Sequence, residues 1–379
     1  MRIALVTEVF LPAVDGVVTR LCGTLEELVR AGDEVLVIAP AGGPPSYAGV
    51  PVVPAPALPV PLYPDGDGYP AKRVSLPTRT LGRALRAFAP ELIHAVNPFL
   101  LAAGAVYHAR RMRVPLVASY HANVPTYAAY YRMGMLESLG WRYVRAVHNR
   151  AHLNLCTSQA TMRMLAERRV RRLALWPYGV DEALKRACAP SRAWRARLSG
   201  GDPDRTLLLF VGRLAREKSI ERLEPVMRAL QGVSLAIVGD GPLRGALERR
   251  FAGTATTFLG LLTGSELARA YASADIFVFP SQTETLGLVM LEAHAAGLPI
   301  IAADSAAARE LVRDGVDGLI YEPTEPASLH RAIGSLAANP ELRRAMGARG
   351  RAAVERATWA HATAVLRDHY QRALAGAAA

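Results

Sequence analysis

The fold is decided by the stretch Asp275-Ile-Phe-Val-Phe-Pro-Ser-Gln-Thr-Glu-Thr-Leu-Gly-Leu-Val-Met-Leu-Glu292, where a short apolar run passes through a polar turn into a segment of helical periodicity. The run Asp275–Phe279 has the length and composition of a strand that is buried on both faces. A buried strand followed directly by a helix is the unit from which helix-covered parallel sheets are built. The stretch therefore predicts an α/β fold.

The same unit recurs along the chain in two series. The strand candidates of the first half are Arg2–Thr7, Glu34–Ala39, Glu91–Ala95, Pro115–Tyr120, Leu153–Thr157 and Leu173–Trp176. Those of the second half are Thr206–Val211, Ser234–Val238, Thr256–Leu259, Asp275–Phe279, Pro299–Ala303 and Gly318–Tyr321. Helical stretches separate most of them, so we predict two Rossmann-like domains with doubly wound parallel sheets that face a central cleft.

The length of 379 residues suits two ordinary domains. The strand–helix pattern gives way to a polar, Arg-rich stretch between Gly179 and Ser199. We therefore place an N-terminal domain at residues 1–185 and a C-terminal domain at residues 186–358. The segment Pro51–Pro77 is rich in Pro, Gly and Tyr, and we expect it to be a long irregular loop.

Composition narrows the class of protein further. Cys22, Cys156 and Cys188 are few and widely spaced, which indicates neither a disulfide framework nor a zinc site. Met1–Val6 runs straight into a strand without the features of a secretory signal, and no apolar run reaches the ~20 residues of a membrane span. We expect a cytoplasmic protein, peripheral at the inner face of the membrane.

The net charge of +12 is concentrated in one segment. From Gly68 to Arg163 there are thirteen Lys or Arg and two acidic residues, a balance of 13 − 2 = +11. One reading is an Arg-rich solvated surface, and the other is a face that meets anionic lipid or an acidic acceptor. Nucleic acid is not an expected partner, because no nucleic-acid-binding motif accompanies the charge.

The most specific chemical signal is the turn and helix after Phe279. A helix that begins at Gly287 and Leu288 would point its free N–H groups and positive dipole end at a bound phosphate. Glu284 lies too near such a phosphate to welcome another anion, so sugar hydroxyls are its expected partners. Glu292, further inside the helix, could accept from ribose hydroxyls.

A second cluster follows the strand Thr206–Val211. Arg213 and Lys218 can bracket a diphosphate and stabilise the charge that gathers on it as a glycosidic bond breaks, so no metal or other cofactor is expected. The backbone near Gly239 could approach a ligand, and the backbone near Leu261 could pair with a base. We read the Asp-x-Asp pairs at 65–67 and 202–204 as turn residues and not as metal ligands.

Two residues of the first half are candidates for contact with the reacting groups. Gly16 follows the first strand and precedes a helix, which suits contact with a phosphate or an acceptor. His121 ends the strand Pro115–Tyr120, and we expect it to face the cleft and not the core. His94 lies at a similar strand end, but a satisfied buried histidine explains it equally well.

An aromatic and basic segment lies in the first half of the chain, between the strand candidates Pro115–Tyr120 and Leu153–Thr157. Its candidate acceptor or membrane contacts are Tyr127, Tyr131, Arg132, Trp141, Arg142 and Arg145. Aromatic rings with Arg side chains that reach toward lipid headgroups suit a membrane interface. A helix hairpin packed on its own domain is the equal alternative, and the sequence does not choose between them.

These motifs together resemble the retaining glycosyltransferase family 4 over nearly the whole chain. Within it, Ser119–Pro125, Leu175–Asp181 and Glu284–Glu292 are most similar to the branch of sulfolipid synthases and lipid mannosyltransferases. The resemblance implies a GT-B fold in which the domain at 1–185 binds the acceptor and the domain at 186–358 binds the nucleotide sugar. It implies a donor diphosphate held by Arg213 and Lys218, and a final helix at residues 359–379 that packs back on the first domain. It also implies that Gly16 and His121 face the reacting sugar.

The predicted function follows from the motifs and the resemblance together. We expect a metal-independent, retaining transfer of a hexose from a UDP- or GDP-linked donor to an acceptor hydroxyl, such as that of diacylglycerol in a membrane. The alternatives are a glycosyltransferase with a soluble acceptor and a sugar-nucleotide epimerase or hydrolase on the same fold. The base, the sugar and the oligomeric state cannot be read from the sequence.

Overall fold

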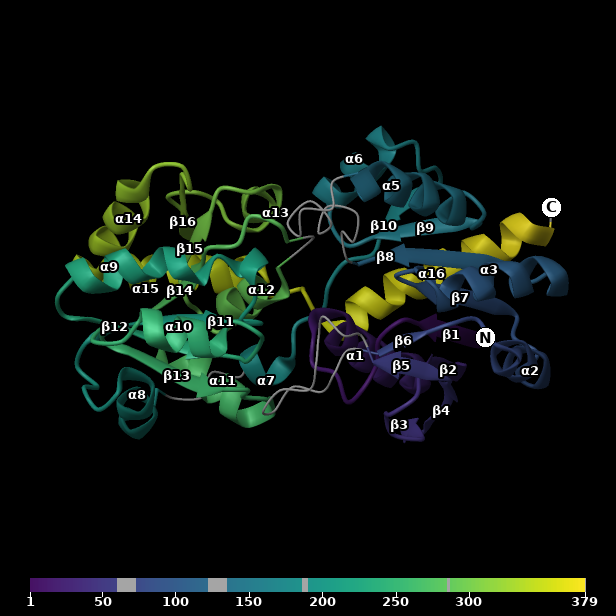
Figure 1. Ribbon diagram of the computed structural model, residues 1–379, viewed down its shortest axis with the longest axis horizontal. Coiled ribbons are helices and arrows are strands. Elements are labelled where there is room, and N and C mark those ends of the chain that lie inside the picture. Colours follow the sequence, from purple (N-terminus) through teal and green to yellow (C-terminus); the bar gives the residue numbers. More distant parts are fainter. Residues whose placement is uncertain (60–72, 122–134, 186–189, 285–286, 379) are drawn as a thin grey trace. The chain divides into compact units, whose positions relative to one another are not determined.

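The computed structural model describes residues 1–59, 73–121, 135–185, 190–284 and 287–378 (Figure 1). The chain divides into two compact units. Unit 1 contains the chain up to Gly179 together with the C-terminal segment from Trp359, and unit 2 contains residues 180–358. No helix of these described ranges is both long and apolar enough to cross a bilayer.

Unit 1 is built on an eight-stranded sheet with the order β10-β9-β8-β7-β1-β2-β4-β3. Its strands are β1 (Arg2–Thr7), β2 (Glu34–Pro40), β3 (Ser46–Tyr47), β4 (Val50–Ala55), β7 (Leu92–Val96), β8 (Leu116–Tyr120), β9 (Leu153–Cys156) and β10 (Leu173–Leu175). Neighbouring strands are parallel except for the short edge pair β3–β4. A separate antiparallel pair is formed by β5 (Ala57–Pro59) and β6 (Arg73–Ser75).

The prediction of a long irregular loop over Pro51–Pro77 is wrong for its described parts, because most of β4 and all of β5 and β6 lie there. Val50 and Val52 of β4 are buried, so the strand contributes to the core despite its prolines. Pro51 faces only the two-residue strand β3, a position near the sheet edge where a missing N–H is tolerated.

Helices cover both faces of the unit 1 sheet. They are α1 (Gly16–Arg30), α2 (Arg79–Phe88), α3 (Leu101–Met112), α5 (Met135–His148), α6 (Gln159–Glu167) and α16 (Trp359–Ala378). Alternate residues of β1 point to opposite faces. Ile3 and Leu5 share a core with side chains of α1 and α16, whereas Ala4 and Val6 pack with side chains of α2, α3 and α5.

The C-terminal helix α16 is an integral part of unit 1, although unit 2 separates it from the rest in sequence (Figure 1). Arg367 Nε lies 2.7 Å from a carboxylate oxygen of the buried Asp33. The ring of Trp359 fills the space over Gly23 and Gly179, where a Cβ atom would come within 2.5 Å of it. Only glycine therefore fits at these two positions.

Unit 2 contains a six-stranded, all-parallel sheet with the order β13-β12-β11-β14-β15-β16 (Figure 1). The strands are β11 (Thr206–Val211), β12 (Val233–Val238), β13 (Thr256–Gly260), β14 (Ile276–Phe279), β15 (Ile300–Ala303) and β16 (Gly318–Tyr321). The helices are α7 (Glu182–Lys185), α8 (Arg192–Ser199), η1 (Arg216–Lys218), η2 (Ile220–Leu223), α9 (Glu224–Ala229), α10 (Arg244–Arg250), α11 (Gly264–Ser273), α12 (Leu288–Ala295), α13 (Ala306–Leu311), α14 (Pro326–Ala338) and α15 (Pro340–Ala353).

All twelve predicted strands are confirmed, and their ends agree with the sequence-based bounds to within one residue. Each sheet reverses its winding direction once. In unit 1 the reversal lies between β1 and β7, and in unit 2 it lies between β11 and β14. In open α/β sheets, ligands bind outside the carboxyl ends of the strands at such a switch point.

Candidate active site

Apart from Gly16, which lies in unit 1, and Glu292, which lies inside a helix, the predicted donor contacts lie at one edge of the unit 2 sheet. They follow the carboxyl ends of the four neighbouring strands β13, β12, β11 and β14, and they are Leu261, Gly239, Arg213, Lys218, Glu284, Gly287 and Leu288. The last five flank the switch point between β11 and β14, which is the expected ligand position of this fold. The fold thus brings together residues that are up to 75 positions apart in the sequence (288 − 213 = 75).

The loops at this edge are held against one another by close backbone contacts. Gly239 has φ +131°, and a Cβ atom there would stand 2.0 Å from the carbonyl oxygen of Gly212. Ser281 Oγ donates to the carbonyl oxygen of Glu217 at 2.9 Å, which ties the loop after β14 to the loop after β11. The close packing against Gly212 therefore requires glycine at position 239, independently of any contact that this residue makes with a ligand.

Lys218 and Glu284 form an ion pair across the switch point. Each side chain is 18% exposed, so the pair is largely but not fully withdrawn from water. The sequence assigned the two residues separate partners, a diphosphate and a sugar. Their pairing holds the ammonium group at this edge of the sheet before a ligand arrives. The lysine side chain therefore loses less conformational entropy when a ligand binds.

The helix α12 begins with an open anion-binding end. Gly287 is its N-cap residue and adopts the left-handed conformation with φ +81°, which favours glycine. In the described part of the chain, no side chain caps this helix start and no acidic residue lies in its first turn. Its first N–H groups and the positive end of its dipole are therefore available to a phosphate.

Glu292 lies inside α12 and is 9% exposed. Its Oε2 accepts a hydrogen bond of 2.8 Å from the hydroxyl of Tyr271 in α11. Burial raises the pKa of Glu292 to about 7, the hydrogen bond from Tyr271 lowers it, and the negative charge of Asp181 raises it further. The carboxyl group therefore changes charge near neutral pH, and its ionised form is the better acceptor for ribose hydroxyls.

In unit 1 the start of α1 differs from that of α12. Asp15 is the N-cap of α1, and its Oδ1 accepts from the N–H groups of Val17 and Val18, both at 3.0 Å. A carboxylate that occupies these donors makes the helix start unfavourable for a phosphate. The contact of Gly16 with a phosphate or an acceptor stays a prediction.

The prediction that His121 faces away from the core is wrong, because the side chain is only 6% exposed and its ring packs edge-on against Trp176. Ser119 Oγ lies 2.8 Å from the Nε2 atoms of both His121 and His94. His94 Nδ1 lies 2.6 Å from the hydroxyl of Tyr370. His94 is thus a satisfied buried histidine, the reading that the sequence left open.

Both histidine rings of this hydrogen-bond chain are neutral. Burial, with a smaller contribution from the Arg20 charge, lowers the pKa of His94 to about 3 and that of His121 well below its usual value. A neutral imidazole has one donor and one acceptor nitrogen, so neither ring brings a positive charge to this part of the unit.

The aromatic and basic segment is only partly described, since Tyr127, Tyr131 and Arg132 lie outside the described residues. The prediction that Trp141 contacts a membrane or acceptor is wrong. Its ring is 6% exposed and stacks on Tyr120 at a centroid distance of 6.4 Å, because α5 turns this side chain toward the sheet. The helix-hairpin alternative applies to Trp141, whereas the Arg side chains of α5 reach the surface.

Arg142 and Arg145 line an open groove that is formed with Arg150, Arg169 and Arg171. Ala146 and Asn149 complete its lining. The groove lies at the opposite edge of the unit 1 sheet from the carboxyl ends of the strands, because α5 ends just before β9 begins and residues 169–171 lie just before β10.

Two polar residues at the unit 1 switch point were not found from the sequence. Glu8 follows β1, and its Oε1 accepts from the N–H groups of Phe99 and Leu100 at 3.1 and 2.8 Å. Asn97 follows β7, and its Oδ1 accepts from the N–H of His121 at 3.4 Å. The position of each residue directly after a strand can be seen in the sequence. It indicates a shared site only when β1 and β7 are known to be neighbours in the sheet.

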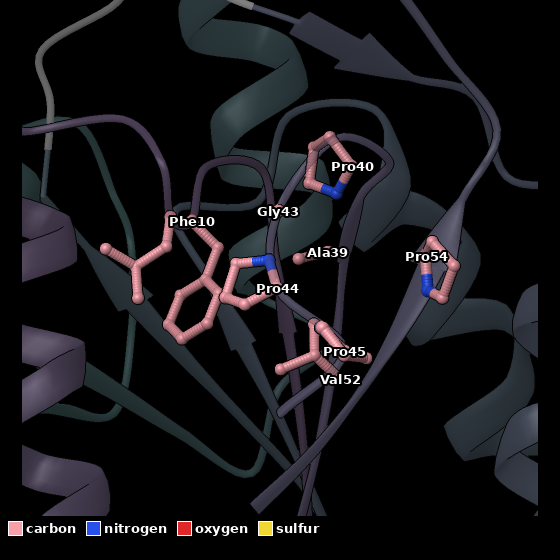
Figure 2. Close-up of a pocket in the computed structure, with 9 residues that line it drawn as sticks. Phe10, Ala39, Pro40, Gly43, Pro44, Pro45, Val52 and Pro54 are labelled. Atoms are coloured by element: carbon pink, nitrogen blue, oxygen red, sulfur yellow. The ribbon is translucent and has the colours of Figure 1, made fainter. Parts of the chain in front are cut away.

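An apolar pocket lies beside the loop that joins β1 to α1 (Figure 2). Its volume is about 140 Å³, and it is lined by Phe10, Leu11, Ala39, Pro40, Gly43, Pro44, Pro45, Val52 and Pro54. These residues lie at or after the carboxyl ends of β1, β2 and β4, the edge that also carries Gly16. Prolines have no N–H to offer, so the lining contains few hydrogen-bond donors and favours apolar groups.

The Asp-x-Asp sequences are placed differently by the structure. Asp65 and Asp67 lie outside the described residues. Asp202 pairs with Arg205, and Asp204 forms a two-pronged ion pair with Arg192 at 2.9 and 3.0 Å. In the described ranges, no cluster of three or more His, Cys, Asp or Glu side chains could hold a metal ion.

Two helix-covered parallel sheets in one chain, with an open helix start and paired charges at the switch point of the second, define the class of GT-B glycosyltransferases. Two family models match the sequence. Residues 14–184 match glycosyltransferase family 4, and residues 196–353 match glycosyl transferases group 1. The chain belongs to glycosyltransferase family 4 and is a nucleotide-sugar-dependent glycosyltransferase.

Curated relatives and solved structures support this assignment. The chain is 35% identical to the sulfoquinovosyl transferase SQD2 of Arabidopsis thaliana, with 94% of this chain and 70% of the relative covered. It is also 35% identical to a GDP-mannose-dependent alpha-mannosyltransferase of Mycolicibacterium smegmatis, with 99% and 98% covered. An alpha-monoglucosyldiacylglycerol synthase of Streptococcus pneumoniae is 26% identical, with 85% and 75% covered. The crystal structure of Anabaena HepE with UDP and glucose shares the fold, with a TM-score of 0.79, 20% identity and coverage of 98% and 99%.

Proposed function

We propose that this glycosyltransferase moves a hexose from a UDP- or GDP-linked donor to a hydroxyl group of a membrane lipid, with retention of the anomeric configuration. The observation that carries the donor part is the switch point of the unit 2 sheet. There the uncapped start of α12 and the ammonium group of Lys218 lie at the ends of neighbouring strands. Both favour a dianionic diphosphate group.

The proposed chemistry requires only groups of this chain and of the two substrates. The acceptor oxygen forms the new bond to the anomeric carbon on the face from which the diphosphate leaves, and the bond between that carbon and the diphosphate oxygen breaks. The proton of the acceptor hydroxyl passes to an oxygen of the leaving diphosphate. Arg213, Lys218 and the α12 start stabilise the charge that develops on the diphosphate, which is the task that a metal ion performs in other enzymes.

The remaining donor contacts follow from the chemistry of each group. Glu284 would exchange its contact with Lys218 for hydroxyl groups of the sugar once the diphosphate draws the ammonium away. Glu292, with its pKa of about 7, would accept from the ribose hydroxyls. We assign no protein nucleophile, because His121 is buried and neutral and donates or accepts as a fixed imidazole.

Two features support a lipid acceptor. The apolar pocket beside the β1–α1 loop (Figure 2) has about the size of a space that holds a benzene ring, so it can take an apolar part of the acceptor. A relative is named for a product that contains diacylglycerol. A lipid acceptor in turn places the protein at a membrane surface as a peripheral protein on the cytoplasmic side.

The test is product analysis by mass spectrometry. Purified protein is incubated with UDP- and GDP-linked hexoses and with vesicles that contain or lack diacylglycerol. We expect a hexosyl lipid with one donor base and an anomeric configuration, read by NMR, equal to that of the donor. The Lys218→Ala variant, which keeps the apolar pocket, is the matched control and should give little product.

Other products would change the assignment in specific ways. Inversion at the anomeric carbon would overturn the proposed front-face chemistry. Transfer to a soluble sugar but to no lipid would overturn the lipid acceptor and leave the donor assignment in place. Free hexose or an epimerised donor without any transfer product would favour the acceptor-free reaction.

A further inference from the structure

The groove formed by Arg142, Arg145, Arg150, Arg169 and Arg171 plays no part in the proposed transfer, since it lies at the edge of the unit 1 sheet away from the carboxyl ends of the strands. It has a volume of about 630 Å³. Its lining residues include five arginines and no acidic residue. The groove is therefore a concentration of positive charge that needs an explanation of its own.

The charge of the groove is not balanced by ion pairs. In the described part of the chain, no carboxylate forms a salt bridge with any of the five arginines. Some arginines of unit 2 are paired, as Arg244 is with Asp240 and Arg309 with Asp304. Like charges that converge without a counter-charge repel one another, so the folded chain holds them together at a cost.

The backbone of the turn that carries Arg169 and Arg171 is held in a fixed conformation. Arg169 and the neighbouring Arg172, which does not line the groove, adopt left-handed conformations with φ of +62° and +55°, which L-residues with long side chains rarely take. Asn149 of the groove floor donates from Nδ2 to the carbonyl oxygen of Arg169 at 3.0 Å and accepts at Oδ1 from the N–H of Arg171 at 2.9 Å. The buried Asn154 also donates to the carbonyl oxygen of Arg171, at 2.7 Å.

The hydrogen bonds of Asn149 hold the turn after α6 against the end of α5. Arginines from these two parts of the chain therefore line the same groove. Strained backbone that its surroundings over-determine is typical of ligand-binding positions. The guanidinium group presents several N–H donors in a planar fork that matches phosphate oxygens. We propose that the groove is a second anion site, which binds a phosphate-bearing group outside the sugar-transfer site.

The phosphate can come from two sources, the headgroup of an anionic phospholipid or a soluble diphosphate. Both use the same guanidinium contacts, and two assays separate them. Co-sedimentation with phosphatidylglycerol vesicles, compared with phosphatidylcholine vesicles, reports the headgroup. Isothermal titration with inorganic diphosphate reports the soluble ion.

The test compares two variants of equal net charge. The groove variant carries Arg142→Gln, Arg145→Gln, Arg169→Gln and Arg171→Gln. The control variant carries four glutamine replacements of exposed arginines of unit 2, at Arg249, Arg269, Arg344 and Arg356. All proteins keep Arg213 and Lys218, so any diphosphate bound at the donor site is common to them.

We expect the groove variant to lose at least ~10-fold in affinity in one of the two assays, and the control variant to lose less than ~2-fold. Both variants should melt within a few degrees of the natural sequence, which shows that the groove change did not unfold unit 1. An equal loss in both variants would overturn the proposal, because general charge would then explain the binding. So would binding by the groove variant that matches the natural sequence. Because neither assay involves sugar transfer, these results stand apart from those that test the proposed function.

Discussion

At the switch point of each unit, a strand is followed by a turn and a helix. The two helices differ in how the N–H groups at their start are capped. In unit 2, α12 starts at a glycine and leaves its first N–H groups without a side-chain cap, with Lys218 nearby across the switch point. In unit 1, α1 starts at Asp15, whose carboxylate takes the N–H groups of Val17 and Val18. The first arrangement attracts an anion and the second repels one. The difference supports our proposal that the diphosphate binds to unit 2.

The largest expected effect comes from the cation at the open helix start. The Lys218→Ala variant should lose at least ~100-fold in turnover, because a fixed donor to the developing charge is removed. The rate is measured as release of nucleoside diphosphate at saturating donor. Arg216→Ala, which removes an exposed charge of the same turn, is the control and should lose far less. Equal losses would mean that the turn attracts the donor only through its overall charge.

The next effect concerns the carboxyl group inside α12. The folded state holds a proton on Glu292 up to a pKa of about 7, whereas the unfolded chain releases it near its ordinary value of 4.5. Stability therefore falls as pH rises between these values, and Glu292→Gln should be more stable than the natural sequence by roughly 2–3 kcal/mol at pH 8. Below pH 4.5 the two proteins should not differ. Urea unfolding at pH 4 and pH 8 measures this, and a pH-independent difference would contradict the raised pKa.

The two glycines at the helix starts should respond differently to the same change. Gly287→Ala places a side chain at φ +81°, which costs about 1–2 kcal/mol and disturbs the helix start, so the KM of the donor should rise. A Cβ atom on Gly16 meets only the Tyr178 hydroxyl, at 4.0 Å, so Gly16→Ala should leave the free energy of unfolding within ~0.5 kcal/mol. A fall in turnover of Gly16→Ala at unchanged stability would place a substrate over this residue. A change in stability at Gly16 as large as that at Gly287 would break the contrast.

The smallest effect tests the closed helix start directly. Asp15→Asn keeps a cap oxygen and removes the charge, so the stability and the affinity for nucleoside diphosphate should both stay nearly unchanged. Asp15→Ala removes the cap and should lose about 1 kcal/mol of stability. Titration calorimetry and urea unfolding give both quantities. An affinity that rises ~10-fold in Asp15→Asn would show that α1 also binds phosphate, and the two helix starts would then have the same role.

The sequence predicted the sheets well because their central strands are buried on both faces and read as continuous apolar runs. β4 was not predicted, because its two prolines were taken as a sign of a turn or loop. Pairings such as Lys218 with Glu284 could be anticipated only as two separate motifs, since the sequence does not say that β11 and β14 are neighbours.

The direction of a single side chain was the hardest property to predict. His121 and Trp141 have the polarity of surface or site residues, yet both are buried, because Trp176 and Tyr120 offer them aromatic partners from other strands and loops. Conversely, the five groove arginines look like ordinary basic residues in an Arg-rich chain. Their convergence depends on Asn149, which the sequence gives no reason to single out.

The return of α16 to unit 1 also dictates an order of events during synthesis on the ribosome. The face of the unit 1 sheet that contains Ile3 and Leu5 is completed by Leu366 and Tyr370, which are made only after all of unit 2. The N-terminal unit therefore waits with an uncovered apolar face while about 180 further residues are translated, which takes on the order of ten seconds or more in a cell. The strands and helices of unit 2 all lie between residues 180 and 358, so this unit can finish folding first. The part of the protein that is translated first is then the part that is completed last.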